Sequence, residues 1–329
     1  MTRFDAFTST LGPLIARYLA VKRALGRRAS SMESILRGLD RFLAACAADL
    51  TRDTFAAWCE SLEKLDASTR RNRLRVVFQL CLFRRRDAPR AFVPDPTQFP
   101  PLPPRRLPHI YTEGDIVRLL ATASGCEPHG ASPLHREVAR LGIVVLYTTG
   151  LRRGEIVRLT LSDYDATTRV LRIRQTKFYK SRLVPLSVDT TGEIDRYLLA
   201  RHTAGAPSHG DAPLLVHCHG ERFRRYTGEG FGLLLRKVIR AAGIRTARGR
   251  SPRIHDLRFT FAAHALLRWY RAGVDVQARL PALATYMGHV SVVSTQYYLT
   301  FLEATAEAAA ERFHTHCSAW LSHHQPEER

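Results

Sequence analysis

Residues 149–155 read Thr-Gly-Leu-Arg-Arg-Gly-Glu and come directly after an apolar run over 141–147. Ser132 and Pro133 predict the start of a helix that leads into this run. Three further segments stand out downstream: Gln-Thr-Lys-Phe-Tyr-Lys at 175–180, His-Asp-Leu-Arg at 255–258, and Gly-His at 288–289 with a tyrosine nine residues after the histidine. Each segment alone is weak evidence. Together they set six side chains in one order: Arg152, Lys177, His255, Arg258, His289 and Tyr298.

The sequence around these segments predicts a mixed domain of helices and strands. Apolar and polar residues alternate over 170–175, and 182–186 reads as a second strand, in which Pro185 indicates an edge position. The segment 175–180 then forms the turn of a small antiparallel sheet. Thr112 and Asp115 predict a helix start, and further helices are expected over 227–242, 255–271, 276–287 and 304–321.

Proline marks a boundary upstream of this domain. Eight of the 17 prolines fall between Pro89 and Pro108, and such a cluster cannot continue a helix. Before it, helical periodicity predicts four helices around 14–25, 32–46, 54–64 and 74–82. We therefore expect a mainly α protein with a small antiparallel β-sheet. Its parts are a four-helix domain over 1–88, a proline-rich linker over 89–108 and a mixed α+β domain over 109–329.

The charge of the chain points to nucleic acid. The formal net charge is +20, from 50 basic and 30 acidic residues. A GC-rich genome explains why 45 of the basic residues are arginine, but not the excess of basic over acidic residues. Seven arginines near the ends of the fourth predicted helix favour a phosphate-contacting surface, with a solvated basic face as the alternative. They are Arg70, Arg71, Arg73, Arg75, Arg84, Arg85 and Arg86.

The six cysteines are scattered without a C-x-x-C pair, as in reduced cytoplasmic proteins. His217-Cys218-His219 has no second ligand pair at zinc-like spacing, so we expect no metal. The N-terminus lacks a signal-peptide core, and the run over 141–147 is far too short to span a membrane. These features predict a cytoplasmic protein, associated with the nucleoid when it acts.

The four segments resemble those of tyrosine recombinases, the phage integrase family. That family carries T-G-[LM]-R, a lysine in a β-turn, H-x-x-R, then G-H or G-W, and a tyrosine nine residues later. The resemblance covers about residues 110–300. The N-terminal part matches the family's core-binding domain in size, position and helical character, as in simple two-domain Xer-like or transposon-encoded recombinases. Phe259 stands where the family often has a second histidine, a position outside the catalytic set.

The chemistry of the six residues also suits a phosphodiester. Two guanidiniums, from Arg152 and Arg258, can clamp the non-bridging oxygens on which charge builds in the transition state. A tyrosine with a pKa of about 10 needs a base or strong positive charge nearby before it attacks. His255, one helical turn from Arg258, is the expected base or a phosphate hydrogen-bonding partner.

The resemblance supplies the remaining roles. Lys177 is the expected general acid for the 5′-hydroxyl that leaves, with Lys180 as the alternative. His289 is expected to hydrogen-bond the phosphate. The nine-residue spacing selects Tyr298 as nucleophile over the adjacent Tyr297. Glu155 either orients Arg152 or is an ordinary surface glutamate.

The resemblance implies a site-specific DNA recombinase that works through a 3′-phosphotyrosyl intermediate, for a mobile element or a resolution system. It also implies a homo-tetramer on double-stranded DNA, and no cofactor, because the phosphotyrosine bond stores the energy of the broken linkage. The alternatives are a type IB topoisomerase and a DNA-binding or architectural factor without catalysis. The sequence selects neither a DNA target nor an accessory partner. It also leaves open integration, excision, transposition and dimer resolution.

Overall fold

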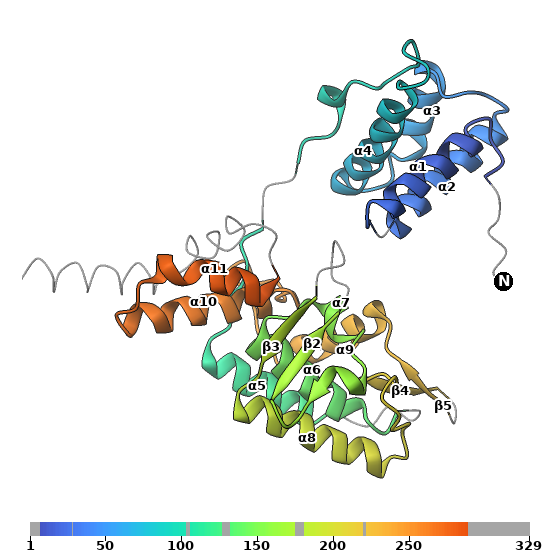
Figure 1. Ribbon diagram of the computed structural model, residues 1–329. Helices are drawn as coiled ribbons and strands as arrows, with labels where there is room; N and C mark the ends of the chain where they lie inside the picture. Colours follow the sequence, from blue (N-terminus) through green and yellow to red (C-terminus); the bar gives the residue numbers. More distant parts are fainter. Residues whose placement is uncertain are drawn as a thin grey trace, which may run out of the picture. The chain divides into compact units, whose positions relative to one another are not determined.

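The computed structural model describes residues 7–27, 29–102, 106–126, 132–174, 181–219 and 222–288. Contacts along the chain divide it into two compact units, with the boundary between Arg106 and Leu107. This boundary lies inside the proline-rich segment. The first unit is helical, drawn in blue to cyan in Figure 1, and the second combines helices with two small antiparallel sheets.

Helices build the first unit, as the periodicity predicted. They are α1 Gly12–Ala24, α2 Ser30–Ala45, α3 Arg52–Ser61 and α4 Ala67–Arg84. The apolar side of each helix faces one shared core. This core includes Ile15, Leu19, Leu36, Leu39, Leu43, Trp58, Val77 and Leu80. The helix starts follow from short polar side chains, because Thr51 accepts from the Thr54 amide and Asp66 from the Thr69 amide. The mainly helical character expected for this part of the chain is confirmed.

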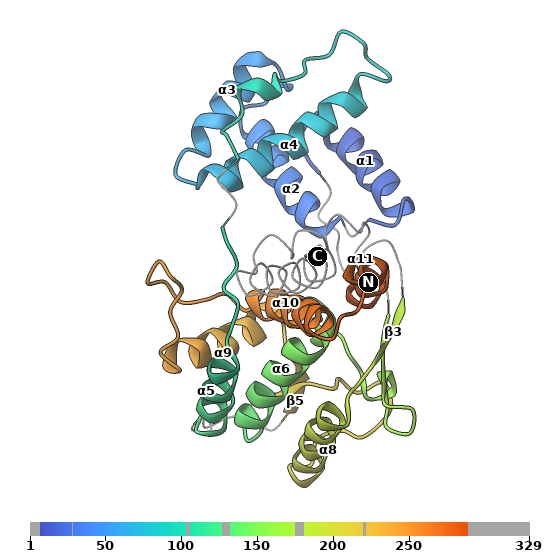
Figure 2. The ribbon, with the colours of Figure 1, turned by 90° about the vertical axis from the view of Figure 1, so that its left-hand side faces the viewer.

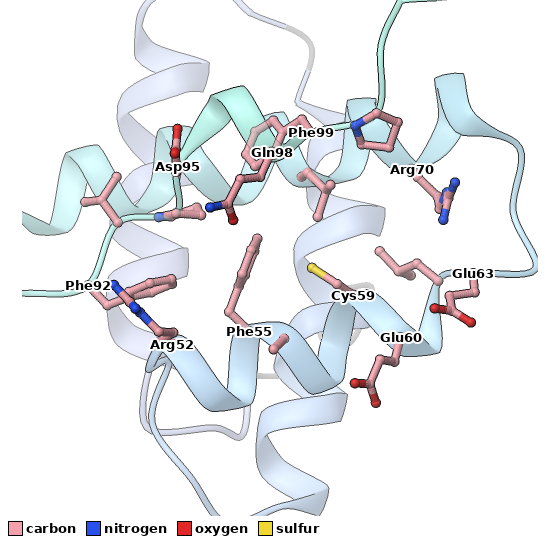
Figure 3. Close-up of a pocket in the computed structure, with 16 residues that line it drawn as sticks. Arg52, Phe55, Cys59, Glu60, Glu63, Arg70, Phe92, Asp95, Gln98 and Phe99 are labelled. Atoms are coloured by element: carbon pink, nitrogen blue, oxygen red, sulfur yellow. The ribbon is translucent and has the colours of Figure 1, made fainter.

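Part of the proline-rich segment packs on this unit. Phe92, Val93 and Phe99 contact its core, and a 3₁₀ turn, η1 Pro96–Gln98, lies among them. Between this segment, α3 and α4 lies a pocket of about 550 Å³. Figure 3 shows Phe55 and Cys59 pointing from α3 toward the segment that carries Phe99. The segment expected to act as a linker thus contributes side chains to the N-terminal core.

Helix α6 lies at the centre of the second unit. It spans His135–Thr149 and packs against several helices, which include α5 Glu113–Ser124, α8 Val188–Thr203, α9 Gly228–Ala241 and α10 Asp256–Arg271. Its residues from Leu141 to Leu146 are all buried, which is why the apolar run is continuous rather than periodic. Gly142 allows the close approach of α9, because a Cβ there would lie 2.7 Å from the Phe231 ring.

The predicted sheet is present, with one strand more than expected. Its order is β1–β2–β3, antiparallel throughout, with β1 Tyr164–Asp165, β2 Val170–Ile173 and β3 Arg182–Pro185. Leu171 pairs with Val184, and both are fully buried. Pro185 lies in an edge strand, as predicted, where its missing amide costs no ladder hydrogen bond.

The remaining elements complete the second unit. A hairpin of β4 Val216–His219 and β5 Arg222–Arg225 precedes α9. After α10, helix α11 Val276–Met287 returns alongside it (Figures 1 and 2). The short helix α7 Arg153–Ile156, the 3₁₀ turn η2 Leu161–Asp163, the helix α8 and the β4–β5 hairpin were not predicted. The helix expected over 304–321 lies outside the described residues.

Among the described residues, no helix combines the length and the apolar character needed to cross a bilayer.

Candidate active site

Arg152 lies at the junction of two helices. Helix α6 ends at Gly150, whose φ of 61° is in the left-handed region, and Arg152 is the N-cap of α7. A Cβ at position 150 would lie 2.5 Å from the Phe261 ring, so only glycine fits this turn. The Arg152 amide donates to Glu155 Oε2 at 2.9 Å, which fixes the first turn of α7.

The guanidinium of Arg152 is held from two sides and stays partly open to solvent. Its Nη1 donates to Glu155 Oε1 at 3.0 Å, and its Nη2 donates to the Gly288 carbonyl at 3.1 Å. Its side chain is 40% exposed. An anchored but accessible guanidinium has the properties that a phosphate ligand needs.

Arg258 is almost completely buried. It is 2% exposed, and its guanidinium donates to the carbonyls of Gly150 and Met287, the latter at 2.8 Å. Because Met287 and Gly288 are consecutive, Arg258 and Arg152 donate to neighbouring carbonyls at the end of α11. The structure therefore brings together the two arginines that the sequence predicted to act as a pair.

A third arginine joins them, and sequence reasoning missed it. Arg182, the first residue of β3, donates from Nε to the Tyr286 carbonyl at 2.8 Å. Three guanidiniums thus meet three consecutive carbonyls at the C-terminal end of α11, where the helix dipole is negative. The available signal was strand alternation: Arg182 and Val184 share the core-facing side of β3, and a charge facing the core needs a partner.

Glu155 is the partner of Arg182. The two Nη atoms of Arg182 donate to Oε1 and Oε2 of Glu155, at 3.1 and 2.9 Å. Burial alone would raise the pKa of this carboxyl, but hydrogen bonds and charge from Arg182, together with Arg152, lower it to about 2. Glu155 is 4% exposed, so it is not a surface glutamate. It holds Arg152, which is the first of the two readings its sequence position allowed.

The glycine at the end of α11 makes this arrangement possible. Gly288 has φ 70°, and its carbonyl accepts from Arg152. A Cβ at this position would lie 2.7 Å from Arg182 Nη1 and 2.9 Å from its Cζ. The left-handed cap therefore both turns the chain and leaves room for the Arg182 guanidinium.

His255 lies at the start of α10, one turn before Arg258, as the sequence predicted. Its ring packs edge-on against Phe259, with centroids 5.4 Å apart. Partial burial and the positive charges of Arg258, Arg253 and Arg152 lower the pKa of His255, with Asp256 opposing them. The ring is therefore neutral at physiological pH and able to accept a proton.

The other three predicted catalytic residues, Lys177, His289 and Tyr298, lie outside the described residues, as do Lys180 and Tyr297. The described chain reaches Gly288, the residue directly before His289. In the parts of the chain that are described, no cluster of three or more histidine, cysteine or acidic side chains could hold a metal ion.

The seven arginines of the N-terminal unit differ in their surroundings. Arg71 donates to the Pro100 carbonyl at 2.5 Å, and Arg85 donates to the Ala91 carbonyl at 3.0 Å. Arg84 forms a two-bond ion pair with Asp49. Arg70 lines the pocket of Figure 3, and Arg86 lies over the Phe83 ring. Of the other two, Arg73 is half-buried and Arg75 is exposed. At least three of the seven therefore stabilise their own domain.

Residues 111–304 match the model of the phage integrase family. This chain belongs to that family. It is 33% identical over 298 residues to the putative integrase/recombinase y4rB of Sinorhizobium fredii, covering 89% of this chain and 93% of that one. It is also 35% identical over 200 residues to the tyrosine recombinase XerD of Mycobacterium tuberculosis, covering 60% and 58%. The protein is thus a site-specific tyrosine recombinase, an enzyme that catalyses DNA strand exchange.

Solved structures share its fold. The Tn1549 transposon integrase in complex with a circular intermediate DNA aligns with a TM-score of 0.64 at 17% identity, over 94% of this chain and all of that one. The XerH recombinase bound to its difH substrate aligns with a TM-score of 0.59 at 18% identity, over 85% and 78%. At these identities the likeness concerns the fold, a helical N-terminal region followed by the integrase catalytic domain.

Proposed function

We propose that this recombinase cleaves DNA with Tyr298 and joins it again through a 3′-phosphotyrosyl intermediate. The observation that carries the proposal is that Arg152 and Arg258 donate to the consecutive carbonyls of Gly288 and Met287. These contacts hold two guanidiniums on adjacent carbonyls at the end of α11, directly before the segment that contains His289 and Tyr298. Such a pair can bind two non-bridging oxygens of one phosphate and stabilise the charge that develops on them.

The proposed reaction balances within these residues. The phenolic oxygen of Tyr298 forms a bond to phosphorus while the bond from phosphorus to the 5′-oxygen breaks. The phenolic proton passes to the neutral ring of His255, and Lys177 donates a proton to the departing 5′-oxygen. His289 hydrogen-bonds the phosphate. The 5′-hydroxyl of a second strand then attacks the phosphotyrosine, and the same proton transfers run in reverse.

The proposed partner is double-stranded DNA that carries two recombination sites, bound by a homo-tetramer in the cytoplasm. The relatives in Sinorhizobium fredii match this chain over nearly its full length, which supports an integrase or recombinase of the same two-part design. A λ integrase was crystallised as a dimer on a core site, and the Tn1549 integrase with a transposon intermediate. By analogy with these, we assign the protein to a mobile element or a resolution system.

Covalent capture tests the nucleophile. The probe is a pool of nicked duplexes with two inverted randomised arms around a short spacer, so that cleavage releases a small fragment and traps the protein on the DNA. Adducts that resist denaturation are recovered, their DNA is sequenced, and the most enriched duplex becomes the standard probe. We expect the adduct to form with the wild type and with Tyr297→Phe, and to be absent with Tyr298→Phe.

Peptide mapping of the adduct and a two-duplex assay complete the test. A phosphorylated peptide that contains Tyr297 instead of Tyr298, or an adduct that persists in Tyr298→Phe, would refute the assignment. Strands exchanged between two labelled duplexes separate recombination from simple relaxation of one duplex. Binding of the enriched duplex without any adduct would instead indicate a DNA-binding factor that lacks catalysis.

A further inference from the structure

Arg182 uses all three of its nitrogens inside the protein. Its Nη atoms bind both oxygens of Glu155, and its Nε binds the Tyr286 carbonyl. Its side chain is 9% exposed. Because both Nη atoms are engaged by one carboxylate and Nε by a carbonyl, we assign Arg182 no direct contact with the DNA phosphate. Its influence on the reaction must pass through the groups that it holds.

The first of these groups is Glu155, which Arg182 and Arg152 share. Oε1 accepts from Arg152 Nη1 and Arg182 Nη1, at 3.0 and 3.1 Å. Arg152 alone with Glu155 would form a pair of zero net charge. With Arg182 present, two positive charges and one negative charge leave the trio at +1. The side chains of Arg182 and Glu155 are buried, at 9% and 3% exposure, so solvent screens their two charges little.

The second group is the end of α11. Arg182 binds the Tyr286 carbonyl, two residues before the Gly288 carbonyl that anchors Arg152. Arg182 also begins β3, five residues after Lys177 in the sequence. One side chain therefore joins three segments of the chain. The first is α7, which follows its N-cap Arg152 and contains Glu155. The second is β3, which follows Lys177 in the sequence, and the third is the end of α11, which directly precedes His289.

We infer that Arg182 is a positioning residue for DNA cleavage: by binding both oxygens of Glu155 and the end of α11, it leaves the positive charge of Arg152 for the scissile phosphate. The inference rests on the proposed role of Arg152 as a phosphate ligand. Without Arg182, the Glu155 carboxylate pairs with Arg152 alone. The guanidinium then turns toward the carboxylate, and its charge is cancelled.

The alternative is that Arg182 only stabilises the fold, as many buried ion pairs do. A matched control separates the two roles. Arg201 on α8 is also buried, at 3% exposure, and donates to a backbone carbonyl, that of Pro213. Arg201→Met removes a buried arginine without touching Glu155 or α11. Thermal unfolding of Arg182→Met, Arg182→Lys and Arg201→Met measures the loss of stability for each.

The decisive measurement compares two forms of the enriched nicked duplex, one with the ordinary scissile phosphate and one with a methylphosphonate, which lacks one negative charge. We expect Arg182→Met to slow single-turnover cleavage of the phosphate by about 10- to 100-fold, the range in which misplacing a supported group acts. Cleavage of the methylphosphonate should slow much less, because a neutral linkage needs less positive charge. Arg182→Lys should lie between, and Arg201→Met should keep the wild-type ratio of the two rates.

A second comparison needs only the ordinary phosphate. Adding Glu155→Gln to Arg182→Met should raise the cleavage rate above that of Arg182→Met, because the uncompensated carboxylate is gone. Equal slowing of both substrates by Arg182→Met, no slowing, or a double variant as slow as the single one would each overturn the inference. If the proposed function itself is wrong, the wild-type protein forms no adduct, or it forms the adduct through another residue.

Discussion

His255, the proposed general base, has a lowered pKa and lies within the electrostatic influence of Arg258 and Arg152. The cations around it, Arg258, Arg253 and Arg152, add to partial burial in disfavouring the protonated ring. The neutral form therefore persists to lower pH than in an ordinary histidine, whose pKa is about 6.5. The charges proposed to bind the phosphate thus also favour the unprotonated form of the proposed base.

This gives a pH prediction with a defined sign. A lowered pKa means that the ring gains its proton, and cleavage loses its base, only as pH falls below the ordinary histidine range. The wild-type rate of adduct formation should hold through neutral pH and decline below about 6.5. Glu155 does not produce this decline, because its pKa of about 2 keeps it ionised throughout.

Substitution identifies the group that titrates. His255→Gln should slow cleavage by about 100-fold or more and remove the acid limb of the profile. His264 is the matched control, since it lies on the same helix, its pKa is also lowered by burial, and it is hydrogen-bonded to Tyr147. His264→Gln should keep the limb. An acid limb that survives in His255→Gln would assign it to another group.

At the scale of elements, two glycines near helix ends have nearly the same positive φ but different surroundings. Gly273 follows α10 and Gly288 follows α11, with φ of 71° and 70°. Nothing lies within 4 Å of a Cβ built on Gly273, whereas a Cβ on Gly288 meets the Arg182 guanidinium. At Gly273 only the positive φ of the backbone favours glycine. The second also makes room for part of the candidate site.

We therefore expect Gly273→Ala and Gly288→Ala to share a destabilisation of about 1 kcal/mol from the left-handed conformation. Gly288→Ala should in addition displace Arg182 and the carbonyl that holds Arg152, and so slow cleavage. Thermal unfolding measures the shared part, and adduct formation on the standard probe measures the rest. Equal cleavage rates for the two variants would show that the close approach at Gly288 has no part in positioning.

These elements also show how far the sequence can predict this molecule. Periodicity located the helices whose apolar stripes are regular, such as α2 and α9. It missed α8, where Thr190, Thr191 and Gly192 in the first turns are poor helix formers, and only tertiary packing of Ile194 and Tyr197 decides the outcome. Motif spacing selected Arg152, His255 and Arg258 as candidates, and the structure brings Arg152 and Arg258 together at the end of α11.

Motif spacing could not identify Arg182, because a long-range contact defines its role. Its partner Glu155 is 27 residues away and its partner Tyr286 is 104 residues away. Within β3 it reads as one more arginine in a chain that has 45. Its burial, which would have drawn attention to it, depends on how α7, β3 and the end of α11 come together in the folded unit.

At the scale of the whole molecule, the net charge of +20 overstates the cations available to DNA. In the N-terminal unit, Arg84 is paired with Asp49, and Arg71 and Arg85 donate to carbonyls of their own domain. Arg75, by contrast, is exposed on α4. The clustering of arginines in the sequence thus combines side chains that hold the domain together with candidates for phosphate contact.

The salt dependence of DNA binding distinguishes these two groups. Each phosphate contact releases condensed counterions, so the logarithm of affinity falls linearly with the logarithm of salt concentration, by a slope of about 0.9 per contact. If Arg75 binds a phosphate, Arg75→Gln should weaken binding of every duplex tested and reduce this slope by about 1. Arg84→Gln should leave the slope unchanged and lower thermal stability, because it leaves Asp49 without its partner.

Titrations of the standard probe from low to moderate salt measure both slopes. A slope that is flat in the wild type would contradict a phosphate-contacting surface, and a slope that responds to Arg84 rather than Arg75 would mean that the ion pair with Asp49 opens on DNA.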